Sequence, residues 1–349
     1  MVAPKKTPSL SDGTLHKIIA DYGFKIVKVD SFRMIWRLKT DAGFKYLKRS
    51  KLTPAEIQFI YEALEYLARQ TFDHIPHFIL NKAGKPYTVD ETGIYIVTDW
   101  YLSQELDFRI LMDLKQAAEF MAEFHLKSRG FTPSRDDIHR TCWLNWPEKL
   151  ENRLRQLCDF HRRALIEKDS SAFSRLYLRY FESYYREAQR SFQMLLRSPY
   201  PEVAAIDYER KSFCHHDYSG RNLLRTFEDH LLLVDFDYCL RDIRIHDLIN
   251  LLVRNLKRTG WNSAIASFIL KEYHQTGRLT REELEVMDVL LHWPQDFWQV
   301  GLQYYYENLP WPEERFLKKL ETKLSFQFER DRFLNEFPER NGVYTWYRK

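Results

Sequence analysis

The segment that decides the fold spans residues 213–237 and reads FCHHDYSGRNLLRTFEDHLLLVDFD. Its two apolar runs, the second of them LLLV at residues 231–234, are separated by a polar turn, so the segment predicts two short paired strands. Asp217 and Asn222 precede the first strand, and Asp235 follows the second. We therefore expect these three polar side chains to lie close together beside the predicted strands.

These residue types predict a particular chemistry. Carboxylate and amide oxygens are the ligands that a hard cation such as magnesium prefers. Phosphoryl transfer requires a metal ion held against the phosphates and a carboxylate near the acceptor hydroxyl, because its barrier is lowered mainly by positioning and charge stabilisation. One asparagine and two aspartates supply most of these polar groups.

The chain before residue 100 has the pattern of a small sheet. Alternating residues predict an antiparallel meander, and Thr53-Pro54 begins a helix whose apolar residues recur at helical spacing. We expect this sheet with one helix to form a lobe over residues 1–99. The predicted strands cover residues 24–30, 34–40, 44–50, 77–81 and 93–98.

Beyond residue 99 the pattern becomes helical. The fold class expected is α+β, in two lobes: a small antiparallel-sheet lobe, and a mainly helical lobe over residues 100–349 that carries a loop at 213–247. The aromatic-rich stretch at 293–311 is interpreted as helix packing rather than a ligand cage. Predicted helices cover residues 113–129, 148–168, 172–196 and most of the chain after 247.

Composition excludes several classes of protein. Of the 349 residues 44% are hydrophobic, enough for a full core, and the net charge of +4 without clustered Lys or Arg argues against a nucleic-acid binder. The four cysteines form no Cys-x-x-Cys pair, which argues against a zinc knuckle or a disulfide framework. No apolar run is long enough for a membrane span. The glycines lie at least nine residues apart, which excludes P-loop and Rossmann motifs. We expect a cytoplasmic protein.

The motif set resembles a known family. His215-x-Asp217 with Asn222, followed by a strand and Asp235-Phe, looks like the core of the kinase superfamily, specifically its aminoglycoside phosphotransferase and choline kinase branch. Asp247 lies only twelve residues after Asp235, which leaves no room for the long activation segment of protein kinases. The resemblance therefore implies a bilobal kinase-like fold with a small-molecule active site, and it implies ATP and magnesium as ligands.

The resemblance also implies roles. Asp217 would orient or deprotonate the acceptor, Asn222 and Asp235 would bind magnesium, Lys48 at the end of YLK would pair with phosphates, and Asp247 would brace the loop.

The partner of Lys48 is expected on the first helix. Glu56 lies at the border of that helix's apolar face, whereas Glu62 points away from it, so Glu56 is the predicted partner. His125 matches the family's histidine at a helix end and is interpreted as a core residue.

Two features depart from the family pattern. The first two strands are joined through bulky Phe32, Arg33 and Met34 where active relatives have a small or Asn-bearing turn. His216 stands where the branch usually has glycine. A transition-metal site at His215 and His216 is disfavoured, because adjacent side chains of an extended segment face opposite ways.

A narrower resemblance points to spore coat proteins. The segments CHHDYSGRNLL and DFDYCLRDIRIHDLINLL, with WPEKLENRL and WPQDFW, look like CotS-type proteins of endospore-forming bacteria. This implies synthesis in the mother cell, deposition on the spore, and other coat proteins as partners. Two functions stay open: transfer of the ATP γ-phosphate to a small-molecule hydroxyl, or a catalytically inactive kinase-fold scaffold in coat assembly. No residue pattern identifies the acceptor.

Overall fold

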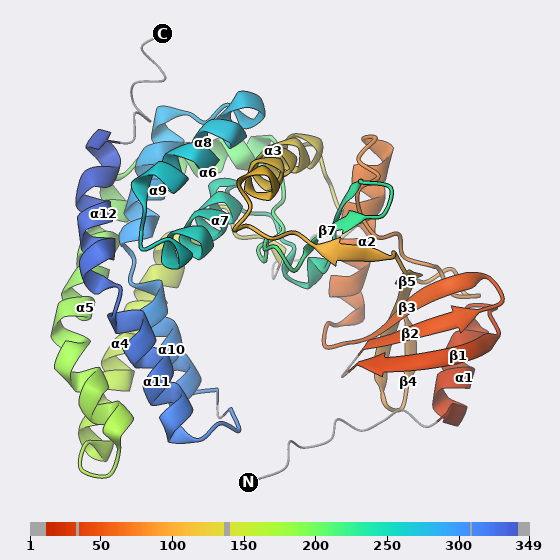
Figure 1. Cartoon of the computed structure of the whole chain (residues 1–349), viewed down its shortest axis with the longest axis horizontal. Helices are drawn as coiled ribbons and strands as arrows, with labels where there is room; N and C mark the ends of the chain where they lie inside the picture. Colours follow the sequence, from red (N-terminus) through yellow and green to blue (C-terminus); the bar gives the residue numbers. More distant parts are fainter. Residues whose placement is uncertain (1–11, 33–34, 136–139, 308, 341–349) are drawn as a thin grey trace. The chain divides into compact units, whose positions relative to one another are not determined.

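The computed structural model describes residues 12–32, 35–135, 140–307 and 309–340 (Figure 1). The chain forms two compact units. The first, called the sheet unit here, contains residues 1–107, 127–141 and 217–239, and the second, the helical unit, contains the remaining residues. The lobe boundary expected at residue 99 remains a prediction.

The main sheet of the sheet unit is antiparallel, with strand order β1-β2-β3-β5-β4. The meander predicted from the sequence is confirmed, and the turn at residues 40–43 closes β2 on β3 with Thr40 opposite Gly43. Arg33 and Met34, named above in the join between the first two strands, lie outside the described residues. The strands are β1 (Ile26–Phe32), β2 (Ile35–Thr40), β3 (Gly43–Ser50), β4 (Thr88–Asp90) and β5 (Gly93–Asp99).

The strand predicted at residues 77–81 is wrong. Only Phe78 forms a bridge there, opposite Thr98 of β5. The chain then leaves the strand edge for a turn, and the next stretch of that edge is paired with β4, a strand that the sequence analysis missed. Each position on the edge of β5 can pair with one segment, so Phe78 and β4 pair with different stretches of that edge.

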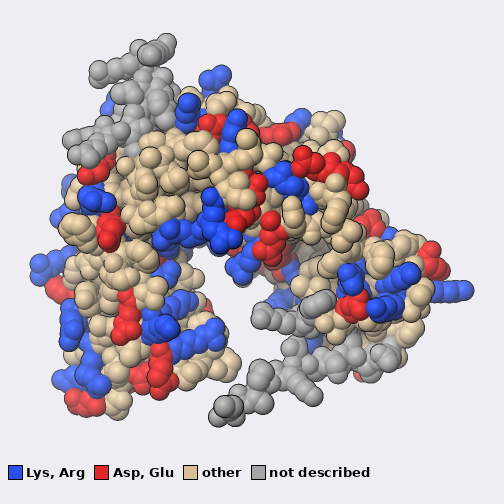
Figure 2. Space-filling model, viewed as in Figure 1, with Lys and Arg blue, Asp and Glu red and all other residues tan. Residues whose placement is uncertain are grey.

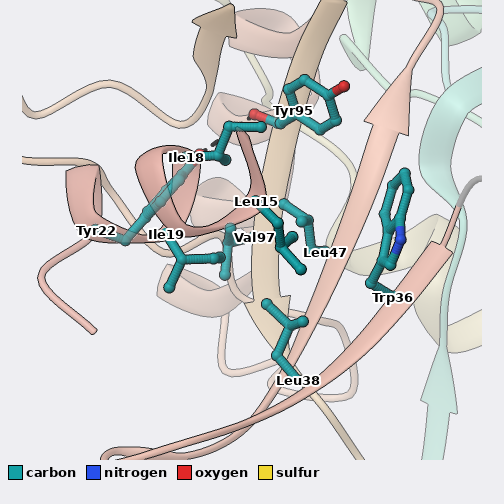
Figure 3. Packing of buried hydrophobic residues seen from close by; sticks show 9 residues of the cluster. All are labelled: Leu15, Ile18, Ile19, Tyr22, Trp36, Leu38, Leu47, Tyr95 and Val97. Atoms are coloured by element: carbon teal, nitrogen blue, oxygen red, sulfur yellow. Dashed lines mark hydrogen bonds between the residues drawn. The ribbon is translucent and has the colours of Figure 1, made fainter. Parts of the chain in front are cut away.

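One face of the main sheet is covered by a helix that the sequence analysis did not predict, α1 (Asp12–Asp21). Figure 3 shows its residues packing against side chains of β2, β3 and β5, including Leu38, Leu47 and Val97. The signal was present, since Leu15, Ile18, Ile19 and Tyr22 follow the i, i+3, i+4, i+7 spacing of a helix face.

The other face of β3 looks toward α2 (Pro54–Arg69), the helix predicted at Thr53-Pro54. A capping box between Thr53 and Glu56 begins this helix, and its buried residues include the predicted apolar face. Side chains alternate along a strand. Because Leu47 packs in the α1 core, Lys48 points to the α2 side, where it lines a pocket with Ile57 and Ile60.

The predicted hairpin after Asp217 is confirmed. It consists of β7 (Leu223–Thr226) and β8 (Leu231–Leu233), which pair antiparallel. A third strand that was not predicted, β6 (Ser103–Glu105), pairs with β7, and the sheet order is β6-β7-β8.

The helical unit contains the predicted helices with shifted ends. Its aromatic segment packs internally as expected, since Tyr177 stacks on Phe297 at 4.2 Å and Phe173 on Tyr304 at 3.9 Å between ring centroids. Among the described residues, no helix combines the length and apolar character needed to span a bilayer. The helices are α3 (Leu111–Lys127), α4 (Trp146–Glu167), α5 (Ala172–Arg197), α6 (Tyr200–Glu209), α7 (Ile245–Arg258), α8 (Ser263–Gly277), α9 (Arg281–His292), α10 (Gln295–Tyr305), α11 (Glu313–Leu324) and α12 (Gln327–Arg340).

We predict that Ile19→Ala destabilises the sheet unit. The side chain is fully buried between α1 and the sheet, and truncation removes apolar contacts while leaving a cavity, which costs about 2–5 kcal/mol. Urea unfolding followed by tryptophan fluorescence would measure the loss. His16→Ala, on the exposed face of the same helix, is the matched control, and an equal effect of both changes would contradict the packing described.

Candidate functional site

Lys48 joins β3 to the segment after β8. Its Nζ lies 2.6 Å from Oδ1 of Asp235 and 2.8 Å from Oδ2 of Asp237. Burial by itself would lower the pKa of Lys48, but the two carboxylates outweigh burial and hold the pKa above its ordinary value. The side chain is therefore a fixed ammonium group that faces two carboxylates in the sheet unit.

Asp235 has an unusual backbone. It follows β8 with φ of +63°, in the left-handed region, and a short 3-10 helix, Phe236–Tyr238, begins directly after it. A non-glycine residue in this region costs of the order of 1 kcal/mol or more, and such strain gathers where side chains must be aimed. The turn leaves the Asp235 side chain 42% exposed while it contacts Lys48.

Asp217 and Asn222 are held together in the loop before β7. The Asn222 Nδ2 donates to the backbone oxygen and to Oδ2 of Asp217, both at 2.9 Å. The backbone of Val234 donates to the Asn222 carbonyl at 2.9 Å, which ties this loop to the residue just before Asp235. The structure thus brings Asp217, Asn222, Asp235 and Lys48 into one connected set of contacts within the sheet unit.

An apolar pocket adjoins this set. Its walls come from α2, β3, β5 and β8, and Lys48, Asp235 and Asp237 are among the residues that line it. Tyr46 and Trp100 also line it, with rings nearly parallel and centroids 6.0 Å apart. A pocket with aliphatic and aromatic walls and a few charged groups suits a flat apolar ring that carries an anionic tail. The sequence analysis did not identify Tyr46 or Trp100.

The predicted metal ligands offer oxygen atoms. Asn222 uses its Nδ2 to bind Asp217, and its Oδ1 accepts no hydrogen bond from the residues that the structure describes. Asp235 is partly exposed and contacts Lys48 through Oδ1. An amide oxygen and carboxylate oxygens form the donor set that magnesium prefers, so the residues present fit this ion.

Glu56 is placed differently from the prediction. Its carboxylate caps α2 through Thr53 and accepts from Arg140 at 2.9 Å, and within the described residues it makes no ion pair with Lys48. The partners of Lys48 are instead Asp235 and Asp237.

Two residues of this site were missed by the sequence analysis. The position of Asp237 could have been predicted, because it lies two residues after Asp235 in the same Asp-Phe-Asp sequence. The position of Arg140 could not: it donates to Glu56 and to the carbonyl oxygens of Asp237 and Cys239, and nothing in its local sequence predicts this position.

In the helical unit, Asp247 braces the backbone that leads to Asp217. Its two oxygens accept the N–H groups of His215 and His216 at 2.7 Å, and His125 Nε2 lies 3.2 Å away. Burial opposes the charge, but these partners hold the pKa of Asp247 well below its usual range. His125 is buried, also contacts the Tyr273 hydroxyl, and has its pKa lowered by burial, as a core residue would.

His216, named above as a departure from the family pattern, has an unusual backbone conformation. Its φ is +64°, a conformation that glycine adopts without cost. The histidine is held there by its surroundings, since its Nε2 lies 3.1 Å from Asp242 and its ring stacks on His246 at 4.0 Å.

The comparisons with known proteins identify the family. Residues 16–337 match the family model described as "Spore coat putative kinase YutH". The chain belongs to the YutH family. A relative of this YutH-family chain, spore coat protein S of Bacillus subtilis (strain 168), is 24% identical over 343 residues, which cover 95% of the chain and 96% of the relative. The resemblance to CotS-type coat proteins is thereby confirmed.

Solved structures confirm the kinase-like fold. An aminoglycoside phosphotransferase from Alicyclobacillus acidocaldarius superposes with a TM-score of 0.78 at 21% identity, covering 98% of this chain and 99% of its own. A spectinomycin phosphotransferase, solved in complex with ADP and spectinomycin, gives a TM-score of 0.60 at 13% identity, covering 96% and 97%. The YutH-family chain therefore combines an antiparallel sheet and a helical region in the manner of small-molecule kinases.

We predict that Asp247→Asn destabilises the protein in a pH-dependent way. Replacing the carboxylate that accepts two buried N–H groups costs about 1.5–3 kcal/mol at pH 7. Because folding lowers the pKa of Asp247, its stabilisation is complete above the ordinary pKa of ~3.9 and is lost as the pH falls below it. Urea unfolding at several pH values would measure the difference between the two proteins.

The control for this measurement is Asp169→Asn, which changes an exposed carboxylate in the same unit. A gap between the wild-type and Asp247→Asn proteins that stays constant from pH 7 into the acid range would contradict the stabilising role assigned to the ionised carboxylate.

Proposed function

We propose that this protein binds ATP and magnesium in the pocket of the sheet unit and transfers the γ-phosphate to a hydroxyl group of a small molecule. The observation that carries the proposal is Lys48, held as an ammonium group against Asp235 and Asp237 beside an apolar pocket. The family and the phosphotransferase neighbours, one of them solved with ADP, support it.

The pocket suits a nucleotide in two respects. The aliphatic side chains and the Tyr46–Trp100 pair would contact the base, and the ammonium group of Lys48 would pair with phosphate oxygens once a metal ion shared the carboxylates. Asn222 and Asp235 would hold the magnesium ion, which would neutralise charge on the phosphates.

Transfer would then be a displacement at phosphorus. The acceptor oxygen forms a bond to the γ-phosphorus, the bond to the bridging oxygen of ADP breaks, and the hydroxyl proton passes to the Asp217 carboxylate. Asn222 donates to Asp217 Oδ2 and so fixes the direction in which that carboxylate faces.

The proposed place of action is the spore coat. The family description and the homologous coat protein support deposition there with other coat proteins, following synthesis in the mother cell. The left-handed His216 at a motif position favours a second candidate, a scaffold that retains the fold without turnover.

We predict that Asp235→Asn abolishes magnesium-dependent ATP binding. The change removes a charged metal ligand and one of the two carboxylates that position Lys48. Isothermal titration calorimetry with ATP, with and without magnesium, would measure it. The matched control is Asp229→Asn in the β7–β8 turn, whose side chain is 77% exposed and pairs with Arg225. ATP binding that is absent in the wild-type protein, or unchanged in Asp235→Asn, would contradict the proposed site.

We also predict that Asp217→Asn separates binding from turnover. Affinity for ATP and magnesium should stay within about twofold of wild type, while ADP formation falls at least about a hundredfold because the proton acceptor is lost. A coupled assay for ADP and immunoblots of spore coat extracts would provide both readouts, with Asp229→Asn as control. Normal coat deposition with no ADP formation by the wild-type protein would favour the scaffold instead.

A further inference from the structure

A second pocket lies wholly within the helical unit and is separate from the site proposed for ATP. It is formed by α7, by the turn between α9 and α10, and by α11 and the start of α12. Its walls are mostly apolar, from residues such as Phe297 and Leu320. Figure 2 shows Lys and Arg side chains over α7, and Lys and Arg together with Asp and Glu side chains over the α10 and α11 pair.

The charged groups of this pocket are unbalanced. Asp296 accepts from Lys257 at 2.6 Å, and Nζ of Lys323 lies 3.4 Å from the same carboxylate, so two ammonium groups share one negative charge. All three side chains are about three-quarters buried. Burial, followed by the repulsion of Lys323 and neighbouring cations, lowers the pKa of Lys257 even though Asp296 opposes the shift.

The remaining cation of the pocket is already paired. Arg330 contacts the Glu187 carboxylate and donates to the carbonyl oxygens of Leu291 and His292. The surplus positive charge therefore comes from the two lysines. A purely structural ion pair would need one of them, whereas an additional anion in the pocket would use both.

Two hydrogen-bond donors in the same walls lack acceptors. The indole N–H groups of Trp261 and Trp293 are buried, and neither has a partner among the described residues. Buried donors are nearly always paired, because a buried donor without an acceptor is destabilising. Trp261 also has φ of +58°, which is rare for a bulky residue and is a form of strain that gathers at binding sites.

We propose that this pocket binds a small organic anion: a carboxylate attached to an aromatic or aliphatic body. The carboxylate would pair with Lys257 and Lys323 and would supply the acceptors that the indole groups lack. The apolar body would contact the walls between α7, α10 and α11. The pocket would reject cations, because an amine would meet two ammonium groups.

The probe is a set of three molecules of equal size: 3-phenylpropionate, 3-phenylpropanol and 3-phenylpropylamine. Each would be titrated into the full-length protein by calorimetry. We expect the acid to bind at least about tenfold more tightly than the alcohol, because a hydrogen bond to a charged group is stronger than one to a neutral group. We expect the amine to bind most weakly. Equal binding of acid and alcohol, or no binding of the acid, would overturn the proposal.

Variants assign the binding to these residues. Lys323→Met, at the more exposed of the two lysines by a small margin, should remove most of the preference for acid over alcohol and keep the wall apolar. Trp293→Phe keeps an aromatic side chain but removes the indole N–H together with part of the ring, so it should reduce the affinity for the acid severalfold more than the affinity for the alcohol. Lys271→Met on the exposed face of α8 is the matched control and should change neither.

Two further measurements separate this site from other effects. Urea unfolding would identify any variant that fails to fold, and the Trp293→Phe result then stands independently of Lys323→Met. Binding of ATP and magnesium should be unchanged in all of these variants. The anion site does not rest on the proposed kinase function, so a wild-type protein without ATP binding would leave this test intact. A preference for acid that survives in both variants would overturn the assignment.

Discussion

The ammonium group of Lys48 has to remain charged while it is largely buried, and the two carboxylates beside it make that possible. Asp235 and Asp237 compensate for the water that Lys48 gives up, and the ion pair links β3 to a segment 187 residues further along the chain. Removing both carboxylates would leave the largely buried ammonium group of Lys48 without a partner, which is costly. The pocket walls of the sheet unit assemble around this link.

The direction of Lys48 is fixed from the opposite face of the sheet. Leu47, its neighbour in β3, belongs to the core beneath α1 together with Leu38 and Val97. A shift of one residue in the pairing of β3 would expose Leu47 and bury Lys48 in that core, so the apolar contacts of α1 enforce the register. The helix α1, which contributes no charged group to the site, thus determines the direction in which the Lys48 side chain points.

The sequence predicted the parts of the site that are encoded locally. The hairpin and its three flanking polar residues lie within one short segment, and strand alternation with turn chemistry was enough to place them together. The same holds for α2, whose capping box and apolar repeat are both visible in the chain. The helix α1 was within reach too, because its apolar spacing is regular, but a polar beginning with Pro and Lys obscured it.

Other features depend on tertiary contacts and could not be predicted in this way. Glu56 was predicted to pair with Lys48 because of its place on α2, yet the choice between two cations is decided by which of them the fold brings near. Arg140 comes from a distant segment, and no periodicity identifies it. The edge of β5 is divided between Phe78, which bridges Thr98, and the short strand β4, which pairs with residues 93–95, and local propensity does not determine which segment pairs with which stretch of the edge.

The contacts of Arg140 have a consequence for how α2 behaves. This guanidinium connects the first turn of α2 to the carbonyl oxygens that follow Asp235, and it does so independently of Lys48. A ligand that drew Lys48 away from its carboxylates would leave these contacts of Arg140 in place. Arg140 therefore holds the first turn of α2 in place before a ligand binds. We infer that ligand binding at Lys48 does not require α2 to move.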